Sequence, residues 1–159
     1  MKTAIIYASK HGTTAFVAGE IKKSLVNDEV VLFNLNDQNK VELRRFDRII
    51  LGSSVYAGSV LPKVRKFIEQ NMVELLQKEL SIFVCCMFFA KAQEQIEKGF
   101  PQALIQHALS VKHLGGEFRF EEMNFIERFL VKKMAGASAS ISKINYKNIE
   151  LFIEEITQK

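Results

Sequence analysis

The feature that most restricts the fold is the alternation of two hydrophobic periods along the chain. Short β-rich apolar runs indicate strands, and the segments between them repeat apolar residues every three or four positions, as amphipathic helices do. The predicted strands are Thr3–Ala8, Glu29–Phe33, Phe46–Ser53, Leu80–Met87 and Val111–Phe120. The predicted helices are the segment through Val17, Ile21 and Leu25, then Pro62–Leu76, Ala92–Lys98, Pro101–Leu109, Met123–Met134 and Tyr146–Thr157.

This order of elements predicts a parallel sheet. Strands that alternate with helices pair in parallel through right-handed crossovers. Leu80–Met87 lacks polar alternation, which is typical of a central strand covered on both faces. We therefore expect the α/β class, with a doubly wound five-stranded parallel sheet in the order 2-1-3-4-5. That order places the carboxyl ends of the first and third strands side by side, where such sheets bind ligands.

Composition restricts the number of domains and the classes of partner that we expect. The 159 residues are 48% hydrophobic and 25% charged, which is enough for a full core, and we expect one domain over residues 1–159. The net charge of +4 comes without a clustered Lys/Arg stripe, so nucleic acid is not an expected partner. The N-terminal apolar run is too short for a signal peptide or a membrane span, and the expected location is cytoplasmic.

The cysteines and histidines show no pattern of a catalytic or metal site. Cys85 and Cys86 are neighbours on a predicted strand, so their side chains point to opposite faces and core packing is expected for both. No Cys/His spacing matches zinc, and no metal is expected. His107 and His113 have no triad partners, and no general base is evident. We predict no catalytic side chain.

The loop after the first predicted strand has the composition of a phosphate site. Ser9, Lys10, His11, Gly12, Thr13 and Thr14 combine hydroxyls, a glycine and the N-terminus of a helix. Free amides and the helix dipole stabilise a phosphate there, and Gly12 permits close approach. Neither G-x-G-x-x-G nor a P-loop motif is present. The alternative is an ordinary helix cap formed by Thr13 or Thr14.

Two further loops are predicted to meet the first one. The loop after the third strand offers small residues and one aromatic ring; it comprises Ser53, Ser54, Val55, Tyr56, Ala57, Gly58 and Ser59. The loop after the fourth strand contains Phe88 and Phe89, which are either core residues or a stacking wall for an aromatic ligand. The three loops together predict a site for an aromatic monophosphate.

Several of these residues resemble known motifs. The segment Ile5–Thr14 resembles the phosphate signature of flavodoxins, T/S-x-T-G-x-T, and Gly52–Gly58 resembles their second flavin loop. The tail resembles the flavodoxin-like branch that contains the menaquinone-dependent protoporphyrinogen IX dehydrogenases, through Gly115–Phe120, Phe125–Phe129 and Lys132–Gly136. The resemblance covers nearly the whole chain and implies a flavodoxin-like three-layer sandwich.

The resemblance also implies non-covalent FMN. Ser9, His11, Gly12, Thr13 and Thr14 would hold the phosphate, with Lys10 contributing its amide. Ser53, Ser54, Val55, Tyr56, Ala57 and Gly58 would border the isoalloxazine, and Met87, Phe88, Phe89 and Ala90 would flank its other side. In flavodoxins a peptide in the second loop bonds to flavin N5 upon reduction, and here the Ala57–Gly58 peptide is the candidate. His11 replaces a usual hydroxyl, and Tyr56 takes the place of the common stacking Trp.

The functional expectation is an FMN-dependent oxidoreductase. The resemblance implies oxidation of protoporphyrinogen IX with a quinone as acceptor; a small molecule or a redox protein would donate the electrons. A flavodoxin-type electron carrier and a non-catalytic FMN-binding module are the alternatives. Carriers are typically acidic to dock basic partners, and the net charge of +4 disfavours that class.

The segment Met123–Met134 allows two interpretations. In the first it is a helix that covers the sheet, with Arg128, Lys132 and Lys133 in solvent. In the second its aromatic and basic side chains form a surface for a quinone or for peripheral contact with the inner face of a membrane. Both interpretations stay open at the level of sequence.

Overall fold

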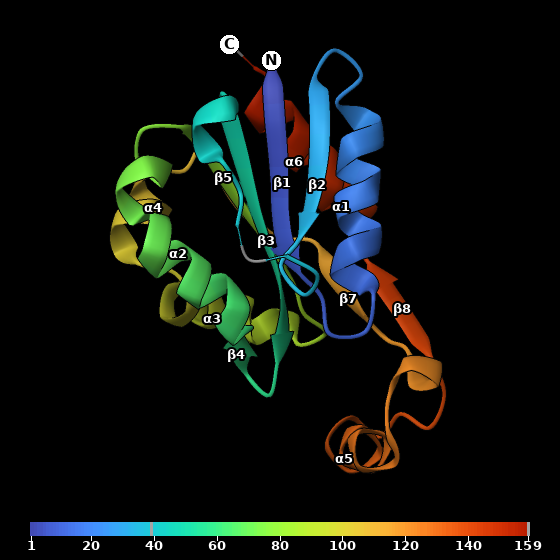
Figure 1. Ribbon diagram of the computed structural model, residues 1–159. Coiled ribbons are helices and arrows are strands. Elements are labelled where there is room, and N and C mark those ends of the chain that lie inside the picture. Colours follow the sequence, from blue (N-terminus) through green and yellow to red (C-terminus); the bar gives the residue numbers. More distant parts are fainter. Residues whose placement is uncertain (39, 159) are drawn as a thin grey trace.

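The computed structural model describes residues 1–38 and 40–158, and it contains a central sheet between two helical layers (Figure 1). Parallel strands run in the order β2-β1-β3-β5-β6, and a two-residue strand, β4 (Ser59–Val60), pairs antiparallel with β3. Their bounds are β1 (Lys2–Ala8), β2 (Glu29–Asn34), β3 (Arg48–Tyr56), β5 (Glu79–Cys85) and β6 (Ser110–His113). The predicted α/β class and strand order are confirmed, because β5 and β6 are the predicted fourth and fifth strands.

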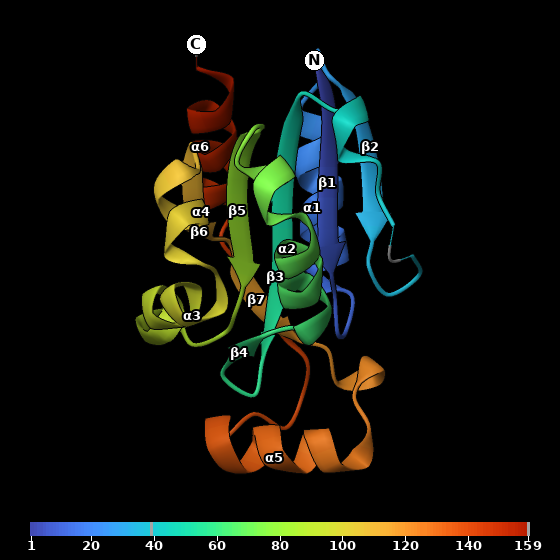
Figure 2. The same cartoon turned by 60° about the vertical axis from the view of Figure 1, so that its left-hand side comes forward.

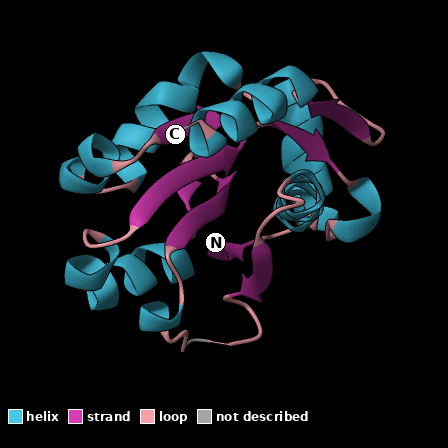
Figure 3. Ribbon diagram, turned by 90° about the horizontal axis from the view of Figure 1, so that it is seen from above, coloured by secondary structure: helices cyan, strands magenta, loops and turns pink. Residues whose placement is uncertain are grey.

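Two layers of helices cover this sheet. Helices α1 and α6 lie on one face, and α2, α3 and α4 lie on the other, as Figures 2 and 3 show. The described helices are α1 (Thr13–Ser24), α2 (Pro62–Leu75), α3 (Ala92–Gly99), α4 (Gln102–His107), α5 (Phe125–Ala135) and α6 (Tyr146–Thr157). Helix α2 begins at Pro62, as predicted, because its missing N–H costs nothing in a first turn.

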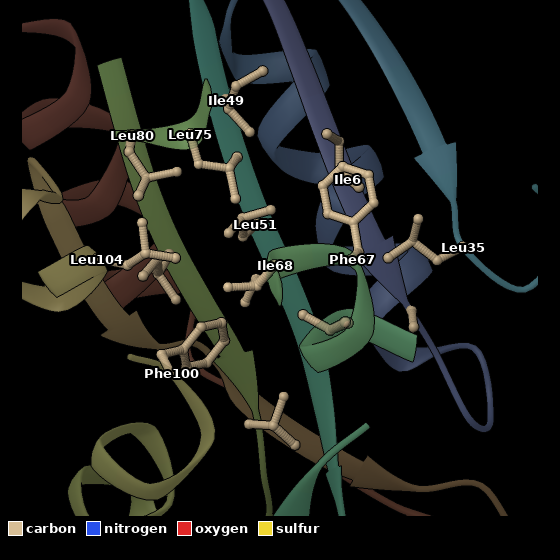
Figure 4. Packing of buried hydrophobic residues seen from close by; sticks show 14 of the residues in the cluster. Ile6, Leu35, Ile49, Leu51, Phe67, Ile68, Leu75, Leu80, Phe100 and Leu104 are labelled. Atoms are coloured by element: carbon tan, nitrogen blue, oxygen red, sulfur yellow. The ribbon is translucent and has the colours of Figure 1, made fainter. Parts of the chain in front are cut away.

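The core is divided by the sheet into two clusters. Successive strand residues point to opposite faces, so Ile5 packs toward α1 and α6 whereas Ile6 packs toward α2. Figure 4 shows Ile6 and Leu51 of the sheet facing Phe67 of α2. Strands buried on both sides hold the carboxyl ends of β1, β3 and β5 at one edge, where the predicted loops begin.

The predicted fifth strand, Val111–Phe120, is wrong in its second half. The chain leaves the sheet after β6, and β7 (Gly115–Phe118) pairs antiparallel with β8 (Ile141–Ile144) in a separate hairpin. Gly115 has a φ of 85°, a left-handed conformation that a continuous strand cannot include. Strand β8 was not predicted, since it is short and mostly exposed.

The interpretation of Met123–Met134 as a helix that covers the sheet is also wrong. Helix α5 lies beyond the carboxyl ends of the strands and covers neither face (Figures 1 and 2). The face in question is covered by α6, which packs Ile149, Phe152 and Ile156 into the core with α1. The β7–β8 hairpin diverts the intervening chain away from the sheet, and α5 keeps most of its apolar side chains exposed.

Candidate functional site

A cavity of about 600 Å³ is lined by the loops at the carboxyl ends of the strands and by α5. All three predicted loops contribute to its walls, and β7 and α5 complete them. Its volume falls within the range of roughly 300–1,000 Å³ that is usual for cofactor pockets. Of the predicted site residues, those that line it are Ser9, Lys10, His11, Thr13, Ser54, Val55, Tyr56, Ala57, Gly58, Met87 and Phe88.

The other predicted site residues lie behind or beside the cavity. Those outside its lining are Gly12, Thr14, Ser53, Phe89 and Ala90. Ser53 is fully buried, and its hydroxyl accepts a hydrogen bond of 3.1 Å from the amide of Leu61. Phe89 stacks on His113 with ring centroids 5.5 Å apart. Of the two phenylalanines in the third loop, Phe88 alone therefore borders the cavity.

The first loop is held in a defined shape at the start of α1. Gly12 is the N-cap with a φ of 92°, and no side chain caps the helix, so the alternative of a cap by Thr13 or Thr14 is wrong. The Ser9 hydroxyl accepts from the Gly12 amide at 3.0 Å, and the Ser54 hydroxyl accepts from the Lys10 amide at 3.0 Å. The two loops are thus tied together beside an uncapped helix N-terminus, which favours an anion.

The second loop is a tight hairpin turn. Ala57 and Gly58 have φ values of 49° and 76° and join β3 to β4. Two consecutive left-handed residues are typical of the type I′ turn, whose twist matches that of paired strands. Ala57 carries strain of about 1–2 kcal/mol in this conformation. The turn places Tyr56 at the mouth of the cavity.

Glu127 of α5 connects both loops and was not predicted as a site residue. Its Oε2 lies 2.8 Å from Nε2 of His11, and its Oε1 accepts from the Tyr56 hydroxyl at 3.2 Å. The Lys10 Nζ lies 3.6 Å from the same Oε1. Burial by itself raises the pKa of Glu127, but the hydrogen bonds from His11 and from the Asn124 amide outweigh burial and lower it.

Glu127 also starts its own helix. It forms a capping box with Asn124, whose Oδ1 accepts from the Glu127 amide at 2.9 Å. The spacing Asn-x-x-Glu is a recognisable signal of a helix N-terminus in sequence. It could have located the helix start, but it says nothing of the contact with His11, which depends on where the hairpin carries α5.

A second missed carboxylate, Glu117 of β7, contacts the first loop. Its Oε2 accepts from the Thr13 hydroxyl at 3.1 Å and from Nε of Arg119 at 2.5 Å. Burial raises the pKa of Glu117, but hydrogen bonds from Arg119 and Ser142 outweigh burial and leave it below its usual value. The β7–β8 hairpin therefore brings paired charges to the start of α1.

The wall opposite the first loop is apolar. Phe88 and Phe118 meet edge to face with ring centroids 6.3 Å apart. The other apolar residues on this side that come from α5 and the turn before it are Met123, Leu130, Val131, Met134 and Ala135. The cavity thus combines an anion-binding end with a wide apolar wall, and this arrangement suits a flat ligand that carries a negative group at one end.

The two cysteines border the cavity but are buried, as the prediction of core packing requires. Burial raises the pKa of Cys85 to about 12 and that of Cys86 to about 11. Both groups are therefore neutral thiols near neutral pH, and a neutral thiol is a poor nucleophile.

Comparisons with known proteins agree with this architecture. The sequence matches the flavodoxin domain family over residues 4–141. A flavodoxin from the domain Archaea has a similar structure, with a TM-score of 0.56 and 21% identity, and the match covers 72% of this chain and 83% of that one. The Flv1 flavodiiron core from Synechocystis sp. PCC6803 gives a TM-score of 0.58 at 15% identity, over 71% of this chain and 30% of that one.

A third structure in this comparison is an NADH:FMN oxidoreductase in its apo form. Its TM-score is 0.56 at 13% identity, and the match covers 73% of this chain and 75% of that one. No curated protein sequence matches the chain. At these identities the likeness between structures establishes the fold.

Proposed function

The chain belongs to the flavodoxin domain family, and on that premise we propose that it is an FMN-dependent oxidoreductase. The main support is the cavity, which places an uncapped helix N-terminus and two aromatic side chains, Tyr56 and Phe88, around one space. This combination fits a phosphate at one end and a flat ring system at the other.

The left-handed backbone of the first loop favours glycine at position 12, and the end of the Arg119 side chain lies close to it. A Cβ at Gly12 would lie 2.8 Å from Nη1 of Arg119, in addition to the strain of its positive φ. Ser9, His11 and Thr13 line the cavity and would hold the phosphate. The Lys10 amide donates to Ser54, and Thr14 is buried outside the lining, so these two residues would shape the loop around the ligand. Gly12 donates its own amide to Ser9, and its part is to keep the turn close to the ligand.

The ring end would be bordered by residues of the second and third loops. Tyr56 and Phe88 supply aromatic surface, and the Ala57–Gly58 peptide forms the turn directly after Tyr56. Ser53, Phe89 and Ala90 lie outside the cavity lining and would support these loops from behind. Bound FMN would accept and release the electrons, so the protein needs only to bind and orient the reactants.

The finer proposal is oxidation of protoporphyrinogen IX with a quinone as acceptor. It is supported by the resemblance of the tail and by the apolar wall that α5 adds to the cavity, since both reactants carry large apolar surfaces. The net charge of +4 disfavours an acidic electron carrier, because surface charge steers carriers to their partners.

The first prediction is that the purified protein is yellow or takes up added FMN, and that it then oxidises protoporphyrinogen IX only when a menaquinone analogue is present. Flavin absorbance and porphyrin fluorescence are the two measurements. A colourless protein that also fails to bind FMN contradicts the whole proposal. A protein that binds FMN but shows no quinone-dependent turnover contradicts the oxidation of protoporphyrinogen IX. That result would favour an electron carrier or a non-catalytic FMN-binding module.

We further propose that the outer face of α5 makes peripheral contact with an anionic membrane. Phe125, Ile126 and Phe129 are 84%, 68% and 58% exposed, and Lys132 and Lys133 lie in the last turn of the same helix. Apolar side chains next to basic ones are typical of helices that lie in a membrane interface. Within the described residues, no helix is both long and apolar enough to cross a bilayer.

The second prediction concerns these lysines. The double variant Lys132→Glu/Lys133→Glu should bind vesicles containing anionic lipid roughly 30-fold more weakly, since each basic residue near such a surface contributes about 1 kcal/mol. Vesicle co-sedimentation measures the change. The matched control is Lys22→Glu/Lys23→Glu at the far end of α1, which makes the same charge change away from α5. Equal binding by all three proteins would contradict the membrane contact.

A further inference from the structure

Arg119 lies directly against the turn of the first loop. Its Nη1 is the atom that a Cβ at Gly12 would meet at 2.8 Å. Its Nε donates to Glu117 Oε2 at 2.5 Å, and the same oxygen accepts from the Thr13 hydroxyl at 3.1 Å. The guanidinium is therefore held against the loop by a carboxylate that is itself hydrogen-bonded to the loop.

The backbone of the hairpin places Arg119 there with little freedom. Gly115 accepts a hydrogen bond of 2.9 Å from the Cys86 amide, which anchors β7 to the end of β5. A Cβ at Gly116 would lie 2.6 Å from the carbonyl carbon of Cys86, so the two backbones are in direct contact. Arg119 follows β7 immediately, and its position is set by these backbone contacts.

Arg119 lies against the Gly12 turn, beside the residues that line the cavity. The basic side chains of the first loop that do line the cavity are already engaged. Lys10 and His11 both pair with Glu127 of α5. Among the described residues, the hydrogen-bond partner of the Arg119 guanidinium is Glu117, which it reaches through Nε. The two terminal nitrogens of the planar guanidinium remain for a second, anionic partner, a geometry that matches a phosphate well.

We propose that Arg119 is a phosphate-binding residue of the flavin site and makes the site select a phosphorylated flavin over an unphosphorylated one. This inference rests on the FMN site proposed above. Glu117 is a positioning residue in this arrangement, because it acts on the ligand only by orienting Arg119 and Thr13. The charged contact would add to the amides of the uncapped helix α1.

The test compares FMN with riboflavin, which differ by the phosphate. We expect Arg119→Gln to weaken FMN binding by about 10- to 100-fold, the effect of losing one hydrogen bond to a charged group. Riboflavin binding should stay unchanged, so the preference for FMN falls by the same factor. Arg119→Lys should restore part of the preference, because it keeps the charge but loses the planar fork. Quenching of flavin fluorescence in titrations of the flavin-free protein measures both affinities.

The controls separate this inference from the proposed function. Arg65→Gln removes an exposed arginine of α2 and should bind both flavins as the wild type does. If Arg119→Gln binds FMN with unchanged affinity, or loses both flavins equally, Arg119 does not bind the phosphate. If the wild type binds neither flavin, the proposed function itself fails. If Arg119→Gln does not fold, Arg119→Lys provides the test. A preference for FMN over riboflavin equal to that of the wild type, at low and at high salt, contradicts the inference.

Discussion

Replacing Gly115 with alanine is expected to disrupt the β7–β8 hairpin and to lower the free energy of unfolding by about 3 kcal/mol. A left-handed φ of 85° costs an alanine about 1–2 kcal/mol. Its Cβ would also overlap the Lys143 carbonyl oxygen and lie 2.6 Å from the Asn145 amide nitrogen. Both are backbone atoms that cannot rotate away, and such overpacking adds roughly 1–3 kcal/mol. Urea denaturation measures the loss.

The matched control is Gly136→Ala, at the end of α5. Gly136 also has a positive φ, 66°, but a Cβ there would meet no atom within 4 Å. We expect the free energy of unfolding of this variant to fall only by the cost of a left-handed φ for alanine, about 1–2 kcal/mol. The difference between the two variants isolates the steric clash at Gly115. Equal losses would show that the close backbone contact is not what fixes the hairpin.

Replacing Glu127 with alanine is expected to release α5 from the cavity while the sheet stays folded. Glu127 is the buried residue of α5, and it bridges His11, Tyr56 and Lys10 as well as forming the capping box. Hydrogen bonds to a charged group contribute about 1.5–3 kcal/mol. A loss of about 3 kcal/mol would speed amide exchange in α5 roughly 100-fold. Hydrogen exchange followed by mass spectrometry reports this segment by segment.

The control for this variant is Glu122→Ala, which removes an exposed carboxylate from the turn just before α5. Its amide exchange in α5 should match the wild type. The exchange rate of α5 in Glu127→Gln should lie between those of the wild type and Glu127→Ala, because the amide oxygen still accepts one hydrogen bond but the charge is gone. If Glu122→Ala and Glu127→Ala exchange alike, α5 is not held by the bridge to the loops.

Lowering the pH provides a second test of the contacts that Glu127 makes with the first two loops. The pKa of Glu127 is lower in the folded protein than in the unfolded chain, where it is about 4.3. Its contribution to docking of α5 is therefore complete above about pH 4.3 and is lost as the pH falls through the lower, folded value. We expect the protection of the α5 amides in the wild type, taken relative to the intrinsic exchange rate at each pH, to fall below about pH 4. In Glu127→Ala this acid step should be missing.

The central sheet could be predicted from the sequence because its signals are local. The apolar runs at Thr3–Ala8 and Leu80–Met87 show strand character within a few residues, and the helical period between strands implies parallel crossovers. The strand order then places the first two loops together without any knowledge of distant contacts. Eleven of the predicted site residues consequently line the cavity.

The region after β6 could not be predicted by the same reasoning. Val111–Phe120 looks like one apolar run, and only the left-handed conformation at Gly115 shows where the chain turns out of the sheet. Strand β8 lacks a buried face, so its pairing with β7 leaves little pattern in the sequence. The apolar stripe of Met123–Met134 is compatible with a sheet-covering helix and with an exposed surface, and in the structure it partly lines the cavity and partly stays exposed.

By itself, the sequence determined the doubly wound sheet and the three loops at its carboxyl edge, since hydrophobic period and loop composition act over short distances. Only the tertiary structure decided what closes that edge. Glu127 meets His11 across 116 positions of sequence, and Arg119 reaches Gly12 because one hairpin is anchored to the end of β5. Contacts of this kind depend on the direction in which a backbone turn sends the chain, which no local pattern of side chains encodes.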